Sequence, residues 1–267
     1  MTHRSTATDS PLRLVVIAAA LVAAGAAQAA VGPASGSGVL DYGAAGNVFE
    51  LSPWLYVQGI DANAKPPSEI VTLNPLLSFS SSMISVNPGL MTIDYRLRNN
   101  SGVSSFFDLR FMFFANPDGD PVAFMDKLSE TWGSAVAGDP VRRAGLDFLS
   151  SPSVINSFIS SINLPDTYDA TCTTGSGCDA TVGLQWNAAM IGPGETFHIV
   201  VGLSDNGQAR SSHWIDITSV SSPPTGTTLR LSGMSQIIPV PEPASAWMLV
   251  AGLAVLGGAA AKRRVRR

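Results

Sequence analysis

Charge, histidine and cysteine are all scarce in this 267-residue sequence. Charged residues make up 13%, and the chain has three histidines and two cysteines. Neither an H-E-x-x-H zinc motif nor a G-x-S-x-G nucleophile elbow occurs anywhere, which excludes the hydrolases that carry those local signatures. The sequence also lacks an internal repeat of solenoid period. Any catalytic site would have to assemble from scattered residues, so we expect a protein that is not an enzyme.

The first 29 residues are typical of a secretory signal peptide. Arg4 and Arg13 supply positive charge, and residues 14–24 form a short apolar core. Ala27-Gln28-Ala29 then matches the small-residue pattern of a cleavage site. We therefore expect export, with a mature chain that starts at Ala30. A retained transmembrane anchor is the alternative.

The last 27 residues have the features of a membrane anchor. Residues 244–261 contain no charge, and 18 residues of helix rise about 27 Å, close to the roughly 30 Å hydrocarbon core of a bilayer. Five cations follow within residues 262–267, which places this basic tail in the cytoplasm and the body on the far side. A buried core helix is the alternative. Pro241 and Pro243 predict an extended hinge just before the helix.

The same segment resembles a known sorting signal. The string Val240-Pro241-Glu242-Pro243-Ala244-Ser245, an apolar helix that ends in Gly257-Gly258 and a closing arginine cluster are similar to the PEP-CTERM signal of Gram-negative bacteria. The resemblance implies that exosortase, a membrane-embedded cysteine transpeptidase, recognises Pro241, Glu242 and Pro243 and removes the helix. It also implies an anchor in the inner membrane before processing and a place at the cell surface or in the extracellular matrix afterwards. The family is associated with bacteria that secrete exopolysaccharide and form biofilms.

Between these two ends lies a body, residues 30–240, that is large enough for one substantial domain. It contains nine Lys and Arg against eighteen Asp and Glu, a net charge of −9. This balance argues against nucleic acid as a partner, and against binding to anionic membranes through a basic patch.

Strand patterns dominate the body. In residues 90–98, Met91, Ile93, Tyr95 and Leu97 alternate with polar residues, which predicts a strand with one dry and one wet face. Together with residues 106–115 this strand predicts an antiparallel hairpin, whose second strand also has a partly covered outer face. Further strands are expected at 54–60, 76–86, 180–187, 196–203, 214–220, 227–231 and 234–240.

These strands, separated by Gly/Pro/Asn turns and without βαβ alternation, predict a mainly β fold, an antiparallel β-sandwich. Immunoglobulin-like and jelly-roll topologies both fit the pattern. The unit Leu184-Gln185-Trp186 followed by Pro193-Gly194-Glu195 loosely resembles immunoglobulin-like sandwiches of bacterial extracellular proteins. A short helical insertion is expected at about 121–163.

The insertion is expected to consist of three helices. Asp139 and Ser151 stand where N-caps would, and each is followed by a proline suited to the first helical position. The helices would then cover residues 121–130, 139–149 and 151–162. The last of these carries an apolar stripe, which we expect to pack on the sandwich.

Two small groups of residues are candidate sites in the body. Cys172 and Cys178 predict a local disulfide, because the protein is expected to be exported; free thiols are the alternative. Asn116, Asp118 and Asp120 place three oxygen ligands in one turn and form a weak calcium candidate. The same residues are also typical of an ordinary turn.

The histidines that remain after signal-peptide removal have ordinary interpretations. His198 should be a solvated or hydrogen-bonded surface residue on one strand. His213 starts a strand, where it could pair with Asp216 or Asp205 to position a serine.

Three classes of function remain. The first is a surface or extracellular-matrix protein with a structural or adhesive role in exopolysaccharide. The second is a carbohydrate-binding module that stacks sugars on Trp54, Trp132, Trp186 or Trp214, among which Trp132 and Trp214 are the better platforms because Trp186 falls among core residues. An extracellular hydrolase is the third, and it lacks a nucleophile and base that the sequence can connect.

Overall fold

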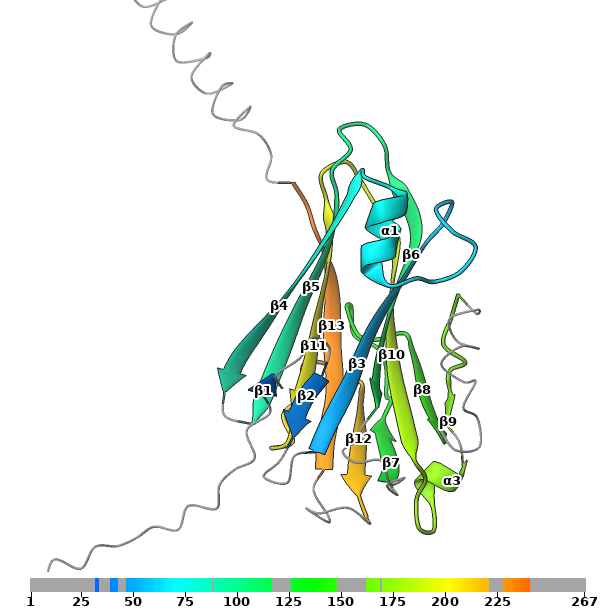
Figure 1. Ribbon diagram of the computed structural model, residues 1–267, viewed down its shortest axis with the longest axis vertical. Coiled ribbons are helices and arrows are strands. Elements are labelled where there is room, and N and C mark those ends of the chain that lie inside the picture. Colours follow the sequence, from blue (N-terminus) through cyan, green and yellow to red (C-terminus); the bar gives the residue numbers. More distant parts are fainter. Residues whose placement is uncertain are drawn as a thin grey trace, which may run out of the picture.

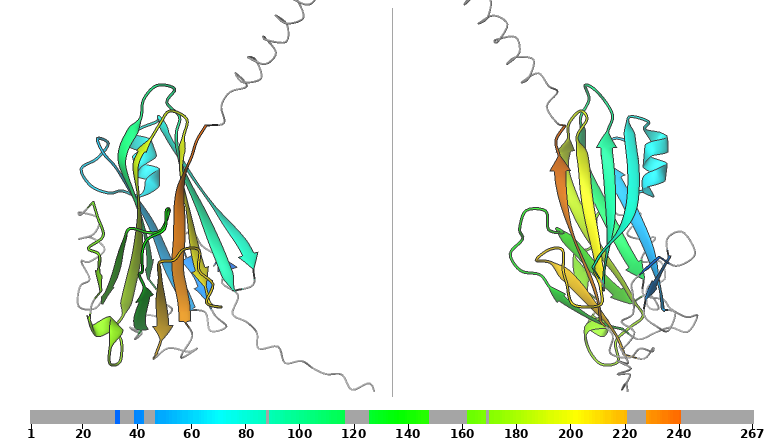
Figure 2. Two further views of the ribbon diagram at one scale, coloured as in Figure 1. Left: turned by 180° about the vertical axis from the view of Figure 1, so that it is seen from behind. Right: turned by 90° about the vertical axis from the view of Figure 1, so that its left-hand side faces the viewer.

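The body is built from two β-sheets that pack face to face, as Figures 1 and 2 show. The computed structural model describes residues 32–33, 39–42, 47–87, 89–116, 126–147, 162–168, 170–220 and 228–240. Its sheets confirm the prediction of a mainly β, antiparallel sandwich.

One sheet has seven strands and the other has six. The first runs in the order β1 (Gly32–Pro33), β2 (Val39–Tyr42), β3 (Asn47–Val57), β6 (Phe106–Asn116), β10 (Ala180–Ile191), β8 (Arg142–Asp147) and β9 (Thr167–Tyr168). The second runs in the order β4 (Leu77–Asn87), β5 (Leu90–Asn99), β11 (Thr196–Ser204), β13 (Thr228–Ile238), β12 (Trp214–Ser219) and β7 (Asp126–Thr131). Paired strands are antiparallel except β8 and β9, which are parallel.

The predicted hairpin of residues 90–115 is wrong in its pairing. Both strands form, but β5 pairs with β4 and β11, whereas β6 pairs with β3 and β10 in the opposite sheet. The chain between them therefore crosses from one sheet to the other. Tyr95 of β5 packs across the core against Phe111 and Phe113 of β6, with ring centroids 5.0 and 6.0 Å apart.

The predicted helical insertion is also wrong wherever the structure describes it. Residues 126–131 form β7 and residues 142–147 form β8, so neither of the first two expected helices exists in this part of the chain. Asp139 caps no helix: it is buried, and its carboxylate accepts the backbone N–H of Val136 and of Ser212 at 2.8 and 3.3 Å. The third expected helix lies outside the described residues, apart from its last residue.

Two short helices lie elsewhere in the part of the chain that the structure describes. Helix α1 (Pro67–Leu73) begins with a proline at its first turn, where the missing N–H costs nothing, and buries Ile70. Helix α3 (Ala170–Thr173) precedes β10. At the end of the body, residues 228–238 form the single strand β13 in place of the two strands expected there.

The core lies between the sheets and extends beyond one of them. Alternating side chains of β5, β6, β10 and β11 fill the space between the two sheets. A second apolar cluster lies on the outer face of β6, where Met112 and Phe114 are 1% and 2% exposed beside Ala64 and Leu164. The prediction that this face is partly covered is therefore confirmed.

Candidate functional site

The chain leaves the body at one end of the sandwich. This end contains the segment around α1, the loop between β5 and β6, the turn between β10 and β11, and the end of β13. β13 ends at Ile238, and in Figure 1 the chain departs from the same end as α1 and the loop between β5 and β6. Val240, the last described residue, lies over the turn between β10 and β11. A Cβ atom added to Gly194 in that turn would meet a Val240 methyl at 2.6 Å. We refer to this region as the tail end.

Asn99 ties the loops of the tail end together. Its fully buried Nδ2 donates to the carbonyls of Ser104 and Gly192 at 2.7 and 2.9 Å. Its Oδ1 accepts the N–H of Ser101 at 2.9 Å, and its own N–H donates to the carbonyl of Glu195 at 2.9 Å. One side chain thus joins the β5–β6 crossing to the β10–β11 turn.

A polar cluster lies on the outer face of the six-stranded sheet. His198 of β11 and Asp94 of β5 are 9% and 7% exposed, with the His198 Nε2 atom 2.5 Å from Asp94 Oδ1. Arg96 donates to both oxygens of Asp94, at 3.3 and 3.0 Å. His198 is therefore hydrogen-bonded, as expected, and more deeply buried than a solvated surface residue.

The residues around Asp94 change the pKa of its carboxyl group. Burial alone raises the pKa of this carboxyl, but the hydrogen bonds from Arg96 and His198 outweigh burial, and the pKa lies below its usual value. On the other side of the histidine, Gln236 lies 3.2 Å from Nδ1. The wet face predicted for β5 is thus filled by polar side chains that bind each other.

A loop then crosses the same outer face. Arg210 donates from its side chain to Thr92 Oγ1 at 2.8 Å and from its backbone N–H to Ser232 Oγ at 2.9 Å. The aliphatic part of the Arg210 side chain passes directly over Gly202, where an added Cβ would meet Arg210 Cγ at 2.7 Å. Thr92 is therefore buried although it points away from the core.

The structure does not bring His213 together with either predicted partner. Its ring nitrogens face the carbonyl oxygens of Pro140 and Gly133 at 3.0 and 2.9 Å. Asp216 instead accepts two hydrogen bonds from Arg230, at 2.7 and 2.8 Å. Asp205 has a buried Oδ1 with no described hydrogen-bond partner, and burial raises the pKa of its carboxyl. His213 therefore links the loop before β12 to the loop between β7 and β8, which contains Gly133 and Pro140.

The tryptophans differ in the groups that contact their rings. Trp186 is fully buried, and Trp54 packs against the second apolar cluster. Trp132 is engaged within the molecule, because it stacks on His213 at 4.2 Å and also carries the guanidinium of Arg143 at 4.7 Å. Trp214 is partly exposed on β12, with the Arg230 guanidinium 4.5 Å from its ring centre. Its ring has one described ring or cation contact, whereas that of Trp132 has two.

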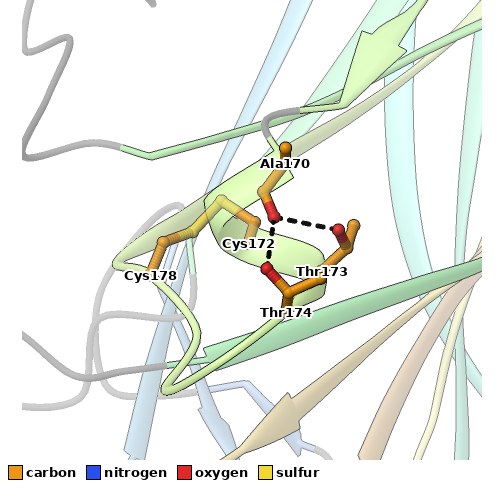
Figure 3. Close-up of a disulfide and its surroundings, with 5 residues drawn as sticks. All are labelled: Ala170, Cys172, Thr173, Thr174 and Cys178. Carbon is orange, nitrogen blue, oxygen red and sulfur yellow. Dashed lines mark hydrogen bonds between the residues drawn. A yellow bond between two sulfur atoms is a disulfide. The ribbon is translucent and has the colours of Figure 1, made fainter.

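The two cysteines lie at the end of the sandwich opposite the tail end. Cys172 and Cys178 form a disulfide, shown in Figure 3, and both are buried. The hydroxyls of Thr173 and Thr174 donate to the carbonyl of Ala170 at 3.0 Å each. Cys178 also exchanges two backbone hydrogen bonds with Asp126, at 2.6 and 2.9 Å, which attaches this loop to β7.

The calcium candidate is only partly within the described residues. Asn116 is the last residue of β6, and Asp118 and Asp120 lie outside them. Among the described residues no group of three or more His, Cys, Asp and Glu side chains is arranged to hold a metal ion.

The predicted signal peptide 1–29, the motif residues Pro241, Glu242 and Pro243, the helix 244–261 and the basic tail 262–267 also lie outside the described residues. Within the part that is described, no helix has the length and apolar character needed to cross a membrane.

Comparison with known proteins identifies the end of the chain. No curated protein and no solved structure matches the sequence or the fold. A family model does match, over residues 239–265, and its description is the PEP-CTERM protein-sorting motif. The match starts one residue after β13 ends. The chain therefore carries a PEP-CTERM sorting motif directly behind its β-sandwich body, and this motif implies an exported protein that is targeted by exosortase.

Proposed function

We propose that the body is a non-enzymatic surface or extracellular-matrix protein with a structural or adhesive role in the exopolysaccharide of a biofilm-forming Gram-negative bacterium. The observation that carries the proposal is the sorting motif at residues 239–265, immediately behind β13. Exosortase is the processing partner, and the anchor in the inner membrane is temporary.

Features of the body fit a displayed scaffold. A disulfide is compatible with an oxidising, exported location. The net charge of −9 in residues 30–240 favours solubility once the anchor is removed.

Replacing Pro241, Glu242 and Pro243 by alanine tests the sorting assignment. The chain should then remain in the inner-membrane fraction, because exosortase would have lost its recognition element. A matched control replaces Ser235 by alanine, because this residue also lies near the end of the body but before the motif. Release of the triple-alanine variant at the wild-type level would refute the assignment.

A carbohydrate-binding module is the second candidate, and Trp214 is the observation that favours it. The ring is partly exposed and lies beside the Asp216–Arg230 ion pair, so an aromatic surface stands next to hydrogen-bonding groups. Trp214→Ala should weaken retention on the producer's own polysaccharide, whereas Trp132→Phe should not. Equal retention of wild type and Trp214→Ala would remove this candidate.

An extracellular hydrolase is the least supported class. The carboxylates of Glu130 and Asp166 do converge, but the guanidinium of Arg143 binds both of them. This cluster fits an ion-pair link between β7 and β8 better than an acid–base pair, since one guanidinium occupies both carboxylates.

A further inference from the structure

Exposed apolar side chains gather at the tail end. Six of them, which we call the apolar rim, are Leu73, Leu76, Val103, Phe107, Met190 and Val240. Val103 is 91% exposed and Phe107 is 53% exposed. Large apolar side chains grouped on a surface in this way usually mark a contact with a partner or a membrane.

Hydrogen bonds, strand register and close contacts place five of the six rim residues together. Phe107 and Met190 are direct cross-strand partners at the ends of β6 and β10. Val103 lies in the loop that Asn99 fastens to the β10–β11 turn, and Val240 covers that turn at Gly194. Leu76 is adjacent as well, because its carbonyl accepts the N–H of Asn100 at 2.7 Å.

Two described turns at the opposite end of the sandwich have a different composition. They read Thr-Gly-Ser-Gly at 174–177 and Asp-Asn-Gly-Gln at 205–208, without any apolar side chain. The loops of the tail end are therefore more apolar than these two turns.

The length of the remaining chain fixes what this end can meet. Only three residues, 241–243, separate Val240 from the uncharged segment 244–261. An extended chain spans at most about 3.5 Å per residue, so Val240 stays within roughly 14 Å of Ala244. While segment 244–261 is in the bilayer, the tail end must therefore stand at the bilayer surface.

We propose that the apolar rim contacts the lipid surface while the protein is anchored, so that the sandwich stands on the membrane by its tail end. This inference rests on the membrane-anchored stage of the proposed function. Apolar side chains at the interface gain by leaving water. The contact would end when exosortase cuts the tail.

Tryptophan quenching in vesicles tests the proposal. The full chain with Trp247→Phe is reconstituted into phosphatidylcholine and phosphatidylglycerol vesicles, with and without brominated acyl chains, which quench nearby indoles. Val103→Trp and, separately, Leu76→Trp should lose fluorescence in the brominated vesicles beyond the loss of the Trp247→Phe background. Both sites are exposed, so the new rings do not disturb the core.

Met83→Trp is the matched control. Met83 is also exposed, but it lies six residues along β4 from Leu77, roughly 20 Å from the tail end. The Met83→Trp variant should lose no fluorescence in the brominated vesicles beyond the loss of the Trp247→Phe background. Equal quenching at Val103 and Met83, in vesicles that carry the protein, would overturn the rim contact because the sandwich would then not stand on its tail end. The absence of quenching at both Val103 and Leu76 would overturn the rim contact as well, and would point to a protein partner for the rim. A chain that fails to float with the vesicles would overturn the membrane-anchored stage itself, together with the contact.

Discussion

Asn99 is the residue on which the geometry of the tail end most depends. It is fully buried and its side chain makes hydrogen bonds to both loops. Asn99→Ala leaves several buried backbone groups without partners, and each such group costs about 1–3 kcal/mol. We expect the free energy of unfolding to fall by about 3 kcal/mol in urea titrations. Asn100→Ala, at an exposed neighbour, should change it by less than about 0.5 kcal/mol.

Because of Asp94, the free energy of unfolding should depend on pH in the acid range. Because the pKa of Asp94 is lowered in the folded protein, the carboxylate stabilises the fold at pH values above the pKa of the unfolded chain. This contribution disappears as the pH falls through the lower folded value. Urea titrations between pH 6 and 2 should therefore show a shallower loss of stability for Asp94→Asn than for wild type.

Arg96→Met is the matched variant for that series. It keeps the carboxylate and removes one of its two hydrogen-bonding partners, so its pH dependence should lie between those of wild type and Asp94→Asn. If the three proteins gave parallel pH profiles, the hydrogen bonds would not be the source of the acid sensitivity.

The disulfide loop can be tested as an element of its own. Cys172 and Cys178 close a loop of seven residues, and closing a loop of this length reduces the entropy of the unfolded chain by an amount worth about 2 kcal/mol. The Cys172→Ser/Cys178→Ser variant should lose this amount in urea titrations. Adding a reducing agent should lower the stability of wild type to the same level and leave the variant unchanged; a further loss in the variant would contradict this origin.

Strands were predicted more reliably than their partners. The alternation of Met91, Ile93, Tyr95 and Leu97 reveals β5, because period two is a local property. It does not reveal whether Tyr95 pairs with β6 or faces it across the core, which depends on β11, a hundred residues later. The same distance in sequence hides the contact between Asp94 and His198.

The two wrong helices have a different physical cause. β7 buries Leu128 and few other side chains, so its sequence has little strand periodicity. In the following loop, Asp139 followed by proline imitates a helix start, while the structure uses the carboxylate to bind Val136 and Ser212. Local cap signals cannot distinguish these two uses of one side chain.

At the scale of the whole molecule, the last strand is also a central one. β13 lies between β11 and β12, so the six-stranded sheet is incomplete without it. A chain of residues 30–240 should keep the melting temperature of the processed protein, whereas residues 30–227 should show no cooperative melting transition by circular dichroism. A cooperative transition in the shorter chain would contradict the central role of β13.

The position of β13 also sets the order of events during export. A chain that crosses the membrane from its N-terminus brings β11 and β12 out first, and the gap between them stays open until the final body residues emerge. Those residues adjoin segment 244–261, which the proposed function places in the bilayer. On that proposal, the six-stranded sheet would close only when the sorting motif reaches the membrane, because β13 is the last strand to emerge.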